Sequence, residues 1–346
     1  MSAFKEALPW ISLPLLVNAP MAGTAGGRLA ACVTLAAGLG LVGSTNDMKN
    51  TRHELNLARE ALASTSHAAS EMLHVGVGFL TFLTSLEEAM EVVREYKPVV
   101  VWLFAAKEVK DYAQWAHAIR GASPAGKIWV QTGSVAAALT IAESARPDAL
   151  CLQGADAGGH GFEKGAGIVS LVPETSDALE AAGHRSISLL ASGGIMDGRG
   201  VAAALSLGAA GVVLGTRFLA SREALVHPKV QASVLEAIDG GQITTRSTLF
   251  DQLRGPNIWP EGYDGRSLVI KSHREYSEGV GLEEIQKRHN EALKDEDQGY
   301  KTGLEGRAAI WAGTGVGLAR DVSSASEIVV SIREDTRKKL TLAAKF

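Results

Sequence analysis

The chain has few cysteines and lacks any long hydrophobic run. Its two cysteines, Cys32 and Cys151, lie in apolar segments, which predicts buried thiols in a reducing compartment and no disulfide. The nine histidines are scattered without the spacing of metal ligands, so no metal site is predicted. No apolar run approaches the roughly 18 residues that span a bilayer, and no leader pattern is present, so we expect a soluble, cytoplasmic protein.

Positive charge is also sparse. The 34 lysines and arginines face 38 acidic residues, for a net charge of -4, and no basic cluster with interleaved aromatic residues occurs. This pattern argues against nucleic-acid binding and favours a small-molecule partner. It leaves the oligomeric state open, with a homodimer among the alternatives.

Apolar runs alternate with alanine-rich helical stretches eight times before about residue 225. The runs show little polar alternation, as expected of parallel strands covered on both faces. Eight such units predict an α/β fold, the (β/α)8 TIM barrel, over a doubly wound sheet of five to seven strands. The expected strands are Leu15–Ala19, Gly40–Gly43, Val75–Leu80, Val99–Phe104, Ile128–Gln131, Ala149–Gln153, Ser188–Ala191 and Gly211–Leu214. The expected helices are Arg28–Ala37, Arg52–Ala63, Leu86–Glu95, Val109–Arg120, Val135–Ala145, Glu174–Ala182 and Arg199–Leu207.

The pattern changes after the eighth unit. Residues 221–305 are more charged and lose the alternation, which predicts a smaller, mostly helical inserted or lid domain. Residues 1–220 and 306–346 would then form the barrel. The run Gly313–Gly317 resembles a dinucleotide loop, but no βαβ unit follows it, so a Rossmann domain is not favoured.

One histidine stands among glycines in Ala157-Gly158-Gly159-His160-Gly161. Glycines let a backbone lie against a flat ligand, and a histidine exchanges protons near neutral pH. The stretch therefore predicts an active-site loop. A tight turn whose histidine only caps a carbonyl is the alternative.

Further candidate residues follow the strands. In barrels, phosphate groups bind at the loops after strands seven and eight, where the chain has Ser192-Gly193-Gly194 and Leu214-Gly215-Thr216. Converging backbone N–H groups and the Thr216 hydroxyl predict a phosphate site, although two ordinary glycine turns would look alike. Ala19, Pro20 and Met21 after strand one, with Gln131 and Gln153 at strands five and six, could border a flat cofactor at the same mouth.

Taken together, these segments resemble the nitronate monooxygenase family, formerly called 2-nitropropane dioxygenases. The motifs are NAPM at 18–21, AGGH at 157–160, SGGI at 192–195 and GTRF at 215–218, and the likeness reappears in Trp259–Arg266 and Trp311–Gly317. The resemblance implies FMN, with His160 as catalytic base. It places the phosphate on Gly193, Gly194, Gly215 and Thr216, and the flavin ring near Ala19, Pro20, Met21, Gln131, Gln153 and Gly158. Gly159, Ser192 and Leu214 complete the cofactor-binding set.

The resemblance implies oxidation of alkyl nitronates, and of nitroalkanes once His160 has taken the α-proton, by O2 to carbonyl compounds and nitrite. An FMN-dependent NAD(P)H enoyl-thioester reductase is the first alternative, and a non-catalytic flavin-binding protein the second. Three positions depart from the family pattern. Val75–Phe79, at the end of the third expected strand, stands where many members place an asparagine that contacts the flavin. Gly161 stands where arginine is common, and Val213 where glutamine is frequent.

Overall fold

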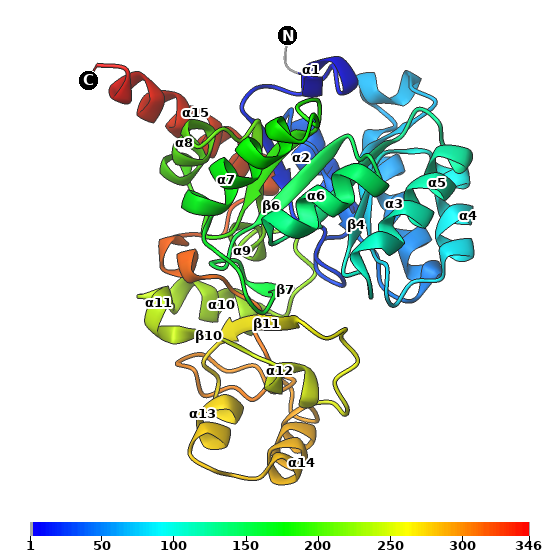
Figure 1. Cartoon of the computed structure of the whole chain (residues 1–346). Coiled ribbons are helices and arrows are strands. Elements are labelled where there is room, and N and C mark those ends of the chain that lie inside the picture. Colours follow the sequence, from blue (N-terminus) through cyan, green and yellow to red (C-terminus); the bar gives the residue numbers. More distant parts are fainter. Residues whose placement is uncertain (1–2, 346) are drawn as a thin grey trace.

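The computed structural model describes residues 3–345, and its centre is a barrel of parallel strands (Figure 1). Its eight strands lie in the order β1-β9-β8-β6-β5-β4-β3-β2. Their bounds are β1 Leu15–Asn18, β2 Leu41–Gly43, β3 Leu73–Leu80, β4 Pro98–Phe104, β5 Lys127–Thr132, β6 Ala149–Gln153, β8 Ser188–Ser192 and β9 Gly211–Leu214. The TIM barrel expected from the sequence is confirmed.

The barrel closes between its first and last strands in the sheet order, β1 and β2, through one isolated backbone bridge and one side chain. An isolated parallel bridge joins Val17 to Leu39 just before β2, and beyond it the amide of Asn18 replaces the backbone ladder. Asn18 Nδ2 donates to the carbonyl of Leu41 at 2.8 Å, and the N–H of Leu41 donates to Asn18 Oδ1 at 2.9 Å. Asn18 is fully buried, so these bonds are shielded from water.

We expect Asn18→Ala to destabilise the barrel strongly. The substitution removes both bonds and leaves the N–H and carbonyl of Leu41 without their partner, at a cost of about 1–3 kcal/mol for each buried group. Thermal unfolding measures the effect, and Asn290→Ala on an exposed face of a helix is the control. An unchanged melting temperature in Asn18→Ala would show that the amide does not hold the seam.

Alternate residues of each strand enter two different cores. Leu15 and Val17 face the barrel interior, while Leu16 packs with the surrounding helices. The interior is plugged at one end by helix α1 (Ala3–Ala7), whose Phe4 ring lies 5.3 Å from that of Trp129. The sequence analysis did not predict α1. Cys151 is buried in the interior as expected, whereas Cys32 is only partly buried.

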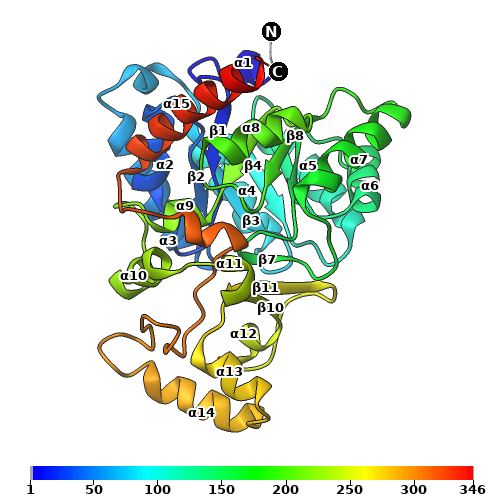
Figure 2. The ribbon, with the colours of Figure 1, turned by 90° about the vertical axis from the view of Figure 1, so that its left-hand side faces the viewer.

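Helices cover the outside of the barrel (Figures 1 and 2). They are α2 Gly27–Leu35, α3 Met48–Leu62, α4 Leu86–Tyr96, α5 Tyr112–Ala122, α6 Val135–Ser144, α7 Ile168–Ala181, α8 Gly198–Ser206 and α9 Thr216–Leu219, with 3-10 turns η1 Ser66–Ala69 and η2 Val109–Asp111. The C-terminal helix α15 (Ala325–Ala343) packs against α2 and α8. Among residues 3–345, no helix combines the length and apolar character needed to cross a membrane.

The segment 221–305 extends from the end of the barrel opposite α1 (Figure 2). It contains α10 Pro228–Glu236, α11 Gly240–Ile243, β10 Thr244–Ser247, α12 Leu249–Gln252, β11 Tyr263–Leu268, α13 Lys271–Ser277 and α14 Leu282–Ala292. The two strands were not predicted. They form an antiparallel sheet with a third unpredicted strand, β7 (Gly159–Phe162), in the order β10-β11-β7. The expected glycine loop around His160 is therefore a strand.

We propose that residues 221–305 form an inserted unit, as the change in sequence pattern predicts. An isolated bridge joins Ser221 to Ser323, so the chain departs from the barrel at 221 and, after residues 306–322, returns at a neighbouring point. The returning chain passes through η3 (Thr314–Leu318) before α15. The short distance between the points of departure and return supports the interpretation of this segment as an insertion into the barrel.

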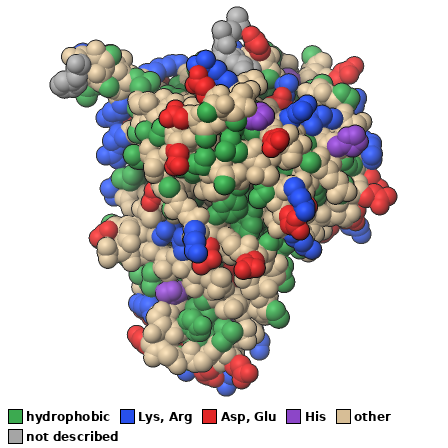
Figure 3. Space-filling model, in the orientation of Figure 1, with side chains coloured by type: hydrophobic (Ala, Val, Ile, Leu, Met, Phe, Trp, Pro, Cys, Tyr) green, Lys and Arg blue, Asp and Glu red, His purple; other side chains and the backbone are tan. Residues whose placement is uncertain are grey.

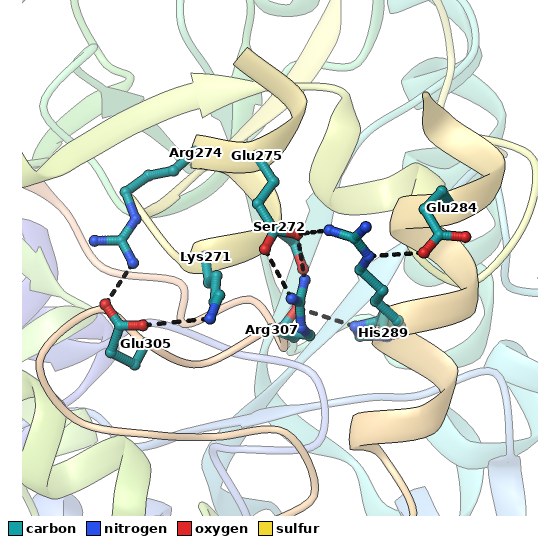
Figure 4. A network of polar contacts seen from close by, with 9 residues as sticks. Lys271, Ser272, Arg274, Glu275, Glu284, His289, Glu305 and Arg307 are labelled. Carbon is teal, nitrogen blue, oxygen red and sulfur yellow. Dashed lines mark hydrogen bonds and ion pairs between the residues drawn. The ribbon is translucent and has the colours of Figure 1, made fainter. Parts of the chain in front are cut away.

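A network of ion pairs ties α13 and α14 to the returning chain (Figure 4). Glu275 lies at its centre and accepts two bonds from Arg307, at 2.8 and 2.9 Å, and one from Arg288, at 2.9 Å. Hydrogen bonds from Arg307 and Arg288 lower the pKa of Glu275 to about 2. The ionised carboxylate therefore stabilises this unit at neutral pH.

Because the pKa of Glu275 is lowered by folding, its stabilising contribution is complete above about pH 4.5 and disappears as the pH falls toward 2. We expect Glu275→Gln to cost about 1–2 kcal/mol at pH 7, limited by partial solvent access, and much less near pH 2. Thermal unfolding at both pH values tests this. Glu278→Gln at the exposed end of α13 is the control, and equal losses in the two variants would contradict the central role of Glu275.

Candidate functional site

A cavity of about 700 Å³ opens at the carboxyl ends of the barrel strands, between the barrel and residues 221–305. Its volume is in the range of small-molecule and cofactor sites. All residues predicted for the site line it except Leu214. The predicted residues that line it are Ala19, Pro20, Met21, Gln131, Gln153, Gly158, Gly159, His160, Ser192, Gly193, Gly194, Gly215 and Thr216.

Leu214 has a different place. Its side chain is buried in the core outside the strands, and its carbonyl accepts a hydrogen bond from the N–H of Ala19 at 2.8 Å. It thus holds β9 beside β1 at the rim of the cavity. Its neighbour Gly215 is the residue that reaches the cavity.

His160 is held by its backbone on strand β7. It lies opposite Gly265 in the ladder with β11, and Gln153 Nε2 donates to its carbonyl at 2.9 Å. One N–H of the Gln153 side chain thus positions β7, and Gln153 also lines the cavity in which the sequence analysis expects a cofactor ring. Both contacts fix the position of the His160 backbone at the open end of the barrel.

The ring of His160 is enclosed by side chains that the sequence analysis did not assign to the site. Nε2 lies 2.7 Å from Asp251 Oδ1. The ring stacks on Trp259, with centroids 3.7 Å apart and planes 8° from parallel, and Trp311 lies at 4.6 Å. The side chains of His160 and Asp251 are only 15% and 9% exposed. The imidazole thus has a fixed orientation in a part of the cavity wall that is largely shielded from water.

The two glycine loops follow the neighbouring strands β8 and β9, and both line the cavity. Gly193 and Gly194 have φ values of +108° and +71°, in the region that favours glycine. A side chain at Gly193 would lie 2.8 Å from the carbonyl oxygen of Gly154. The backbone of this loop is therefore exposed to the cavity without side-chain obstruction, which suits an anionic group.

The run Gly313–Gly317 also belongs to this wall. Gly313 and Gly315 line the cavity, and the N–H of Gly313 donates to Thr216 Oγ1 at 3.0 Å. A Cβ atom at Gly315 would lie 2.8 Å from the carbonyl oxygen of Gly194. The run that resembles a dinucleotide loop thus packs directly on the predicted phosphate loops.

Close packing accounts for two departures from the family pattern. A Cβ atom at Gly78 would lie 2.5 Å from Cβ of Pro20, so the proline occupies the space of a side chain there. A Cβ atom at Gly161 would lie 2.6 Å from Gln153 Oε1 and 3.4 Å from Arg246 Nη2. Arg246 of β10 therefore lies directly beside Gly161. Nothing in the structure explains valine at 213.

The charge on the visible surface is mixed. Figure 3 shows acidic and basic side chains interspersed on this face of the molecule, with apolar side chains between them. Among residues 3–345, no group of three or more histidine, cysteine or acidic side chains is arranged to hold a metal ion. The polar side chains that line the cavity include Gln131, Gln153, Thr216, Arg254 and His160 with its partner Asp251.

Comparisons with known proteins agree with this geometry. The nitronate monooxygenase npaC of Metarhizium robertsii is 44% identical over 345 residues, 98% of this chain and 95% of the relative. A nitronate monooxygenase of Neurospora crassa is 36% identical over 363 residues, 98% and 93% of the two chains.

Two solved structures share the fold. FabK from Thermotoga maritima superposes with a TM-score of 0.77 at 24% identity, covering 100% of this chain and 99% of its own. A nitroalkane oxidase from Streptomyces ansochromogenes gives 0.73 at 22% identity, covering 99% and 100%. The family model for nitronate monooxygenase matches residues 88–335. The chain therefore belongs to the nitronate monooxygenase family.

Proposed function

We propose that this protein is an FMN-dependent nitronate monooxygenase that oxidises alkyl nitronates with O2 to carbonyl compounds and nitrite. The observation that carries the proposal is a single cavity lined both by His160 and by the glycine backbone of the loops after β8 and β9. Relatives named nitronate monooxygenase, aligned over nearly the whole chain, support the same activity.

The residues present fit FMN. The exposed backbone of Gly193, Gly194 and Gly215 and the hydroxyl of Thr216 would hold one phosphate group. Pro20 and Met21 line the same cavity as this phosphate site, and their apolar surface suits a flat ring. FMN, when bound, supplies the transfer of electrons from the substrate to O2.

The protein's own groups orient the substrate and manage its proton. The His160 ring would hold an anionic nitronate by a hydrogen bond, or take the α-proton of a neutral nitroalkane. Trp259 and Trp311 exclude water around it, which strengthens such polar contacts.

Two measurements test the proposal. The purified protein is expected to release FMN on denaturation, identified by chromatography, and to consume O2 and form nitrite with propyl nitronate. Release of FAD, or no flavin after reconstitution, would contradict the cofactor. Turnover of an enoyl thioester with NADPH, without nitrite from propyl nitronate, would establish the reductase alternative. Flavin binding without either activity would indicate a non-catalytic protein.

A further inference from the structure

The contact between His160 and Asp251 links two parts of the chain that are 91 residues apart. His160 lies on β7, and Asp251 lies on the short helix α12 within the inserted segment. Leu249 and Phe250, the residues before Asp251, are buried in the core of that segment, and the hydroxyl of Ser247 accepts from the N–H of Leu249 at 3.1 Å. The carboxylate is therefore presented from a fixed turn.

The contact determines which nitrogen of His160 carries a proton. An ionised carboxylate only accepts hydrogen bonds, so Nε2 must be the donor toward Asp251 Oδ1. In the neutral ring this leaves Nδ1 with the lone pair. Nδ1 has no hydrogen-bond partner within the described residues, so it is the nitrogen that can exchange a proton with a ligand.

Asp251 depends on the histidine in turn. Its side chain is 9% exposed, and its second oxygen, Oδ2, is buried without a hydrogen-bond partner in the part of the chain that the structure describes. The bond to His160 is therefore the one side-chain hydrogen bond that the Asp251 carboxylate makes among the described residues. A buried carboxylate with one hydrogen-bond partner is stabilised most when that partner is positively charged.

Other charged groups near β7 are engaged elsewhere or do not contact the ring. On β10 and β11, Arg246 and Asp264 form an ion pair with each other, and Arg266 donates to the carbonyl of Ala155. Arg254, beyond α12, lines the cavity and is exposed. Asp251 is thus the charged side chain that bonds the imidazole.

We propose that Asp251 is the positioning residue of His160: it holds Nε2–H, turns Nδ1 toward the ligand and stabilises the ring after proton uptake. The inference rests on the proposed function for its catalytic meaning. With a neutral nitroalkane, Nδ1 takes the proton from the α-carbon, the C–H electron pair stays on the substrate as the nitronate, and the resulting imidazolium remains paired with Asp251. With a preformed nitronate, it is the ring carrying protons on both nitrogens whose Nδ1–H donates to the anion.

The test is Asp251→Asn in the full-length protein, which keeps the shape of the side chain and removes its charge. The pH at which the His160 ring takes up its second proton is followed by NMR of histidine-labelled protein, and the signal is assigned by its loss in His160→Asn. We expect this midpoint to fall, because the variant removes the negative charge that contacts the ring. The acid limb of the kcat/KM profile should move in the same direction, and kcat should fall about tenfold or more.

Asp239→Asn is the matched control, since Asp239 is an exposed aspartate of the same segment whose left-handed backbone asparagine tolerates. An unchanged NMR midpoint in Asp251→Asn would overturn the positioning role, whatever the activity. A lowered midpoint in a protein that forms no nitrite from nitronates would support the positioning role and refute the proposed function instead. Should the asparagine variant not fold, Asp251→Ser removes the same charge and is titrated in its place.

Discussion

His160→Asn is expected to lower kcat/KM for neutral nitroalkanes by about 10²–10⁴-fold, the usual contribution of a general base. Asparagine is polar and similar in size but takes up no proton. A preformed nitronate has already lost that proton, so its oxidation should fall far less. Nitrite formation with both substrate forms measures the difference.

Flavin content serves as the internal control for His160→Asn. The His160 side chain contacts Asp251, Trp259 and Trp311 and, within the described residues, makes no hydrogen bond to the predicted phosphate loops, so bound flavin should equal that of the wild type. Full retention of both activities with normal flavin content would return His160 to the role of a turn or strand residue. Loss of flavin would indicate a structural role.

Gly158→Ala is expected to disrupt the cavity itself. A Cβ atom at Gly158 would lie 2.4 Å from both the carbonyl carbon of Ala312 and the nitrogen of Gly313. Backbone atoms cannot rotate away, and the N–H of Gly313 is bonded to Thr216. Overpacking of this kind costs about 1–3 kcal/mol or more. Moving the two segments apart also displaces Gly313 from the phosphate loops, so flavin affinity should fall by about tenfold to a hundredfold.

Equilibrium dialysis of flavin and thermal unfolding of Gly158→Ala measure these effects. Gly121→Ala is the control, because Gly121 lies on α5 and an added Cβ there would meet nothing within 4 Å. Alanine in a helix is favoured by about 1 kcal/mol over glycine, so the control should be neutral or slightly stabilised. Wild-type flavin affinity in Gly158→Ala would show that residues 312–313 yield easily and do not form a rigid wall.

The barrel strands were predictable because each is buried on both faces and is therefore a run of hydrophobic residues in the sequence. Strand β7 has no such hydrophobic run. Its sequence Gly-His-Gly-Phe has little β propensity, and it becomes a strand only because β11 pairs with it. Two helices also begin earlier in the structure than the sequence predicts. α3 begins at Met48, capped by Asp47, and α7 begins at Ile168 and contains Pro173, where the prediction began at Arg52 and Glu174.

The site was predictable where it lies at strand ends, since parallel strands of a barrel deliver their carboxyl ends to one mouth. The lining residues Pro20, Gln131 and Gly194 were found in this way. Asp251 was not, because no local pattern distinguishes an aspartate on a four-residue helix from a surface residue. Trp259 had a signal only through its place in a segment of family resemblance.

Strand β7 also determines how this protein could be recombined with its relatives. The strand is encoded between β6 and α7, yet its ladder partner β11 is encoded in the segment 221–305. A chimaera that exchanged 221–305 alone would graft a foreign partner strand onto the native His160, together with a foreign neighbour for its ring. The interchangeable module is therefore discontinuous: it comprises Gly159–Phe162 and the inserted segment together, and a crossover placed between them would separate a histidine from the strand that sets its position.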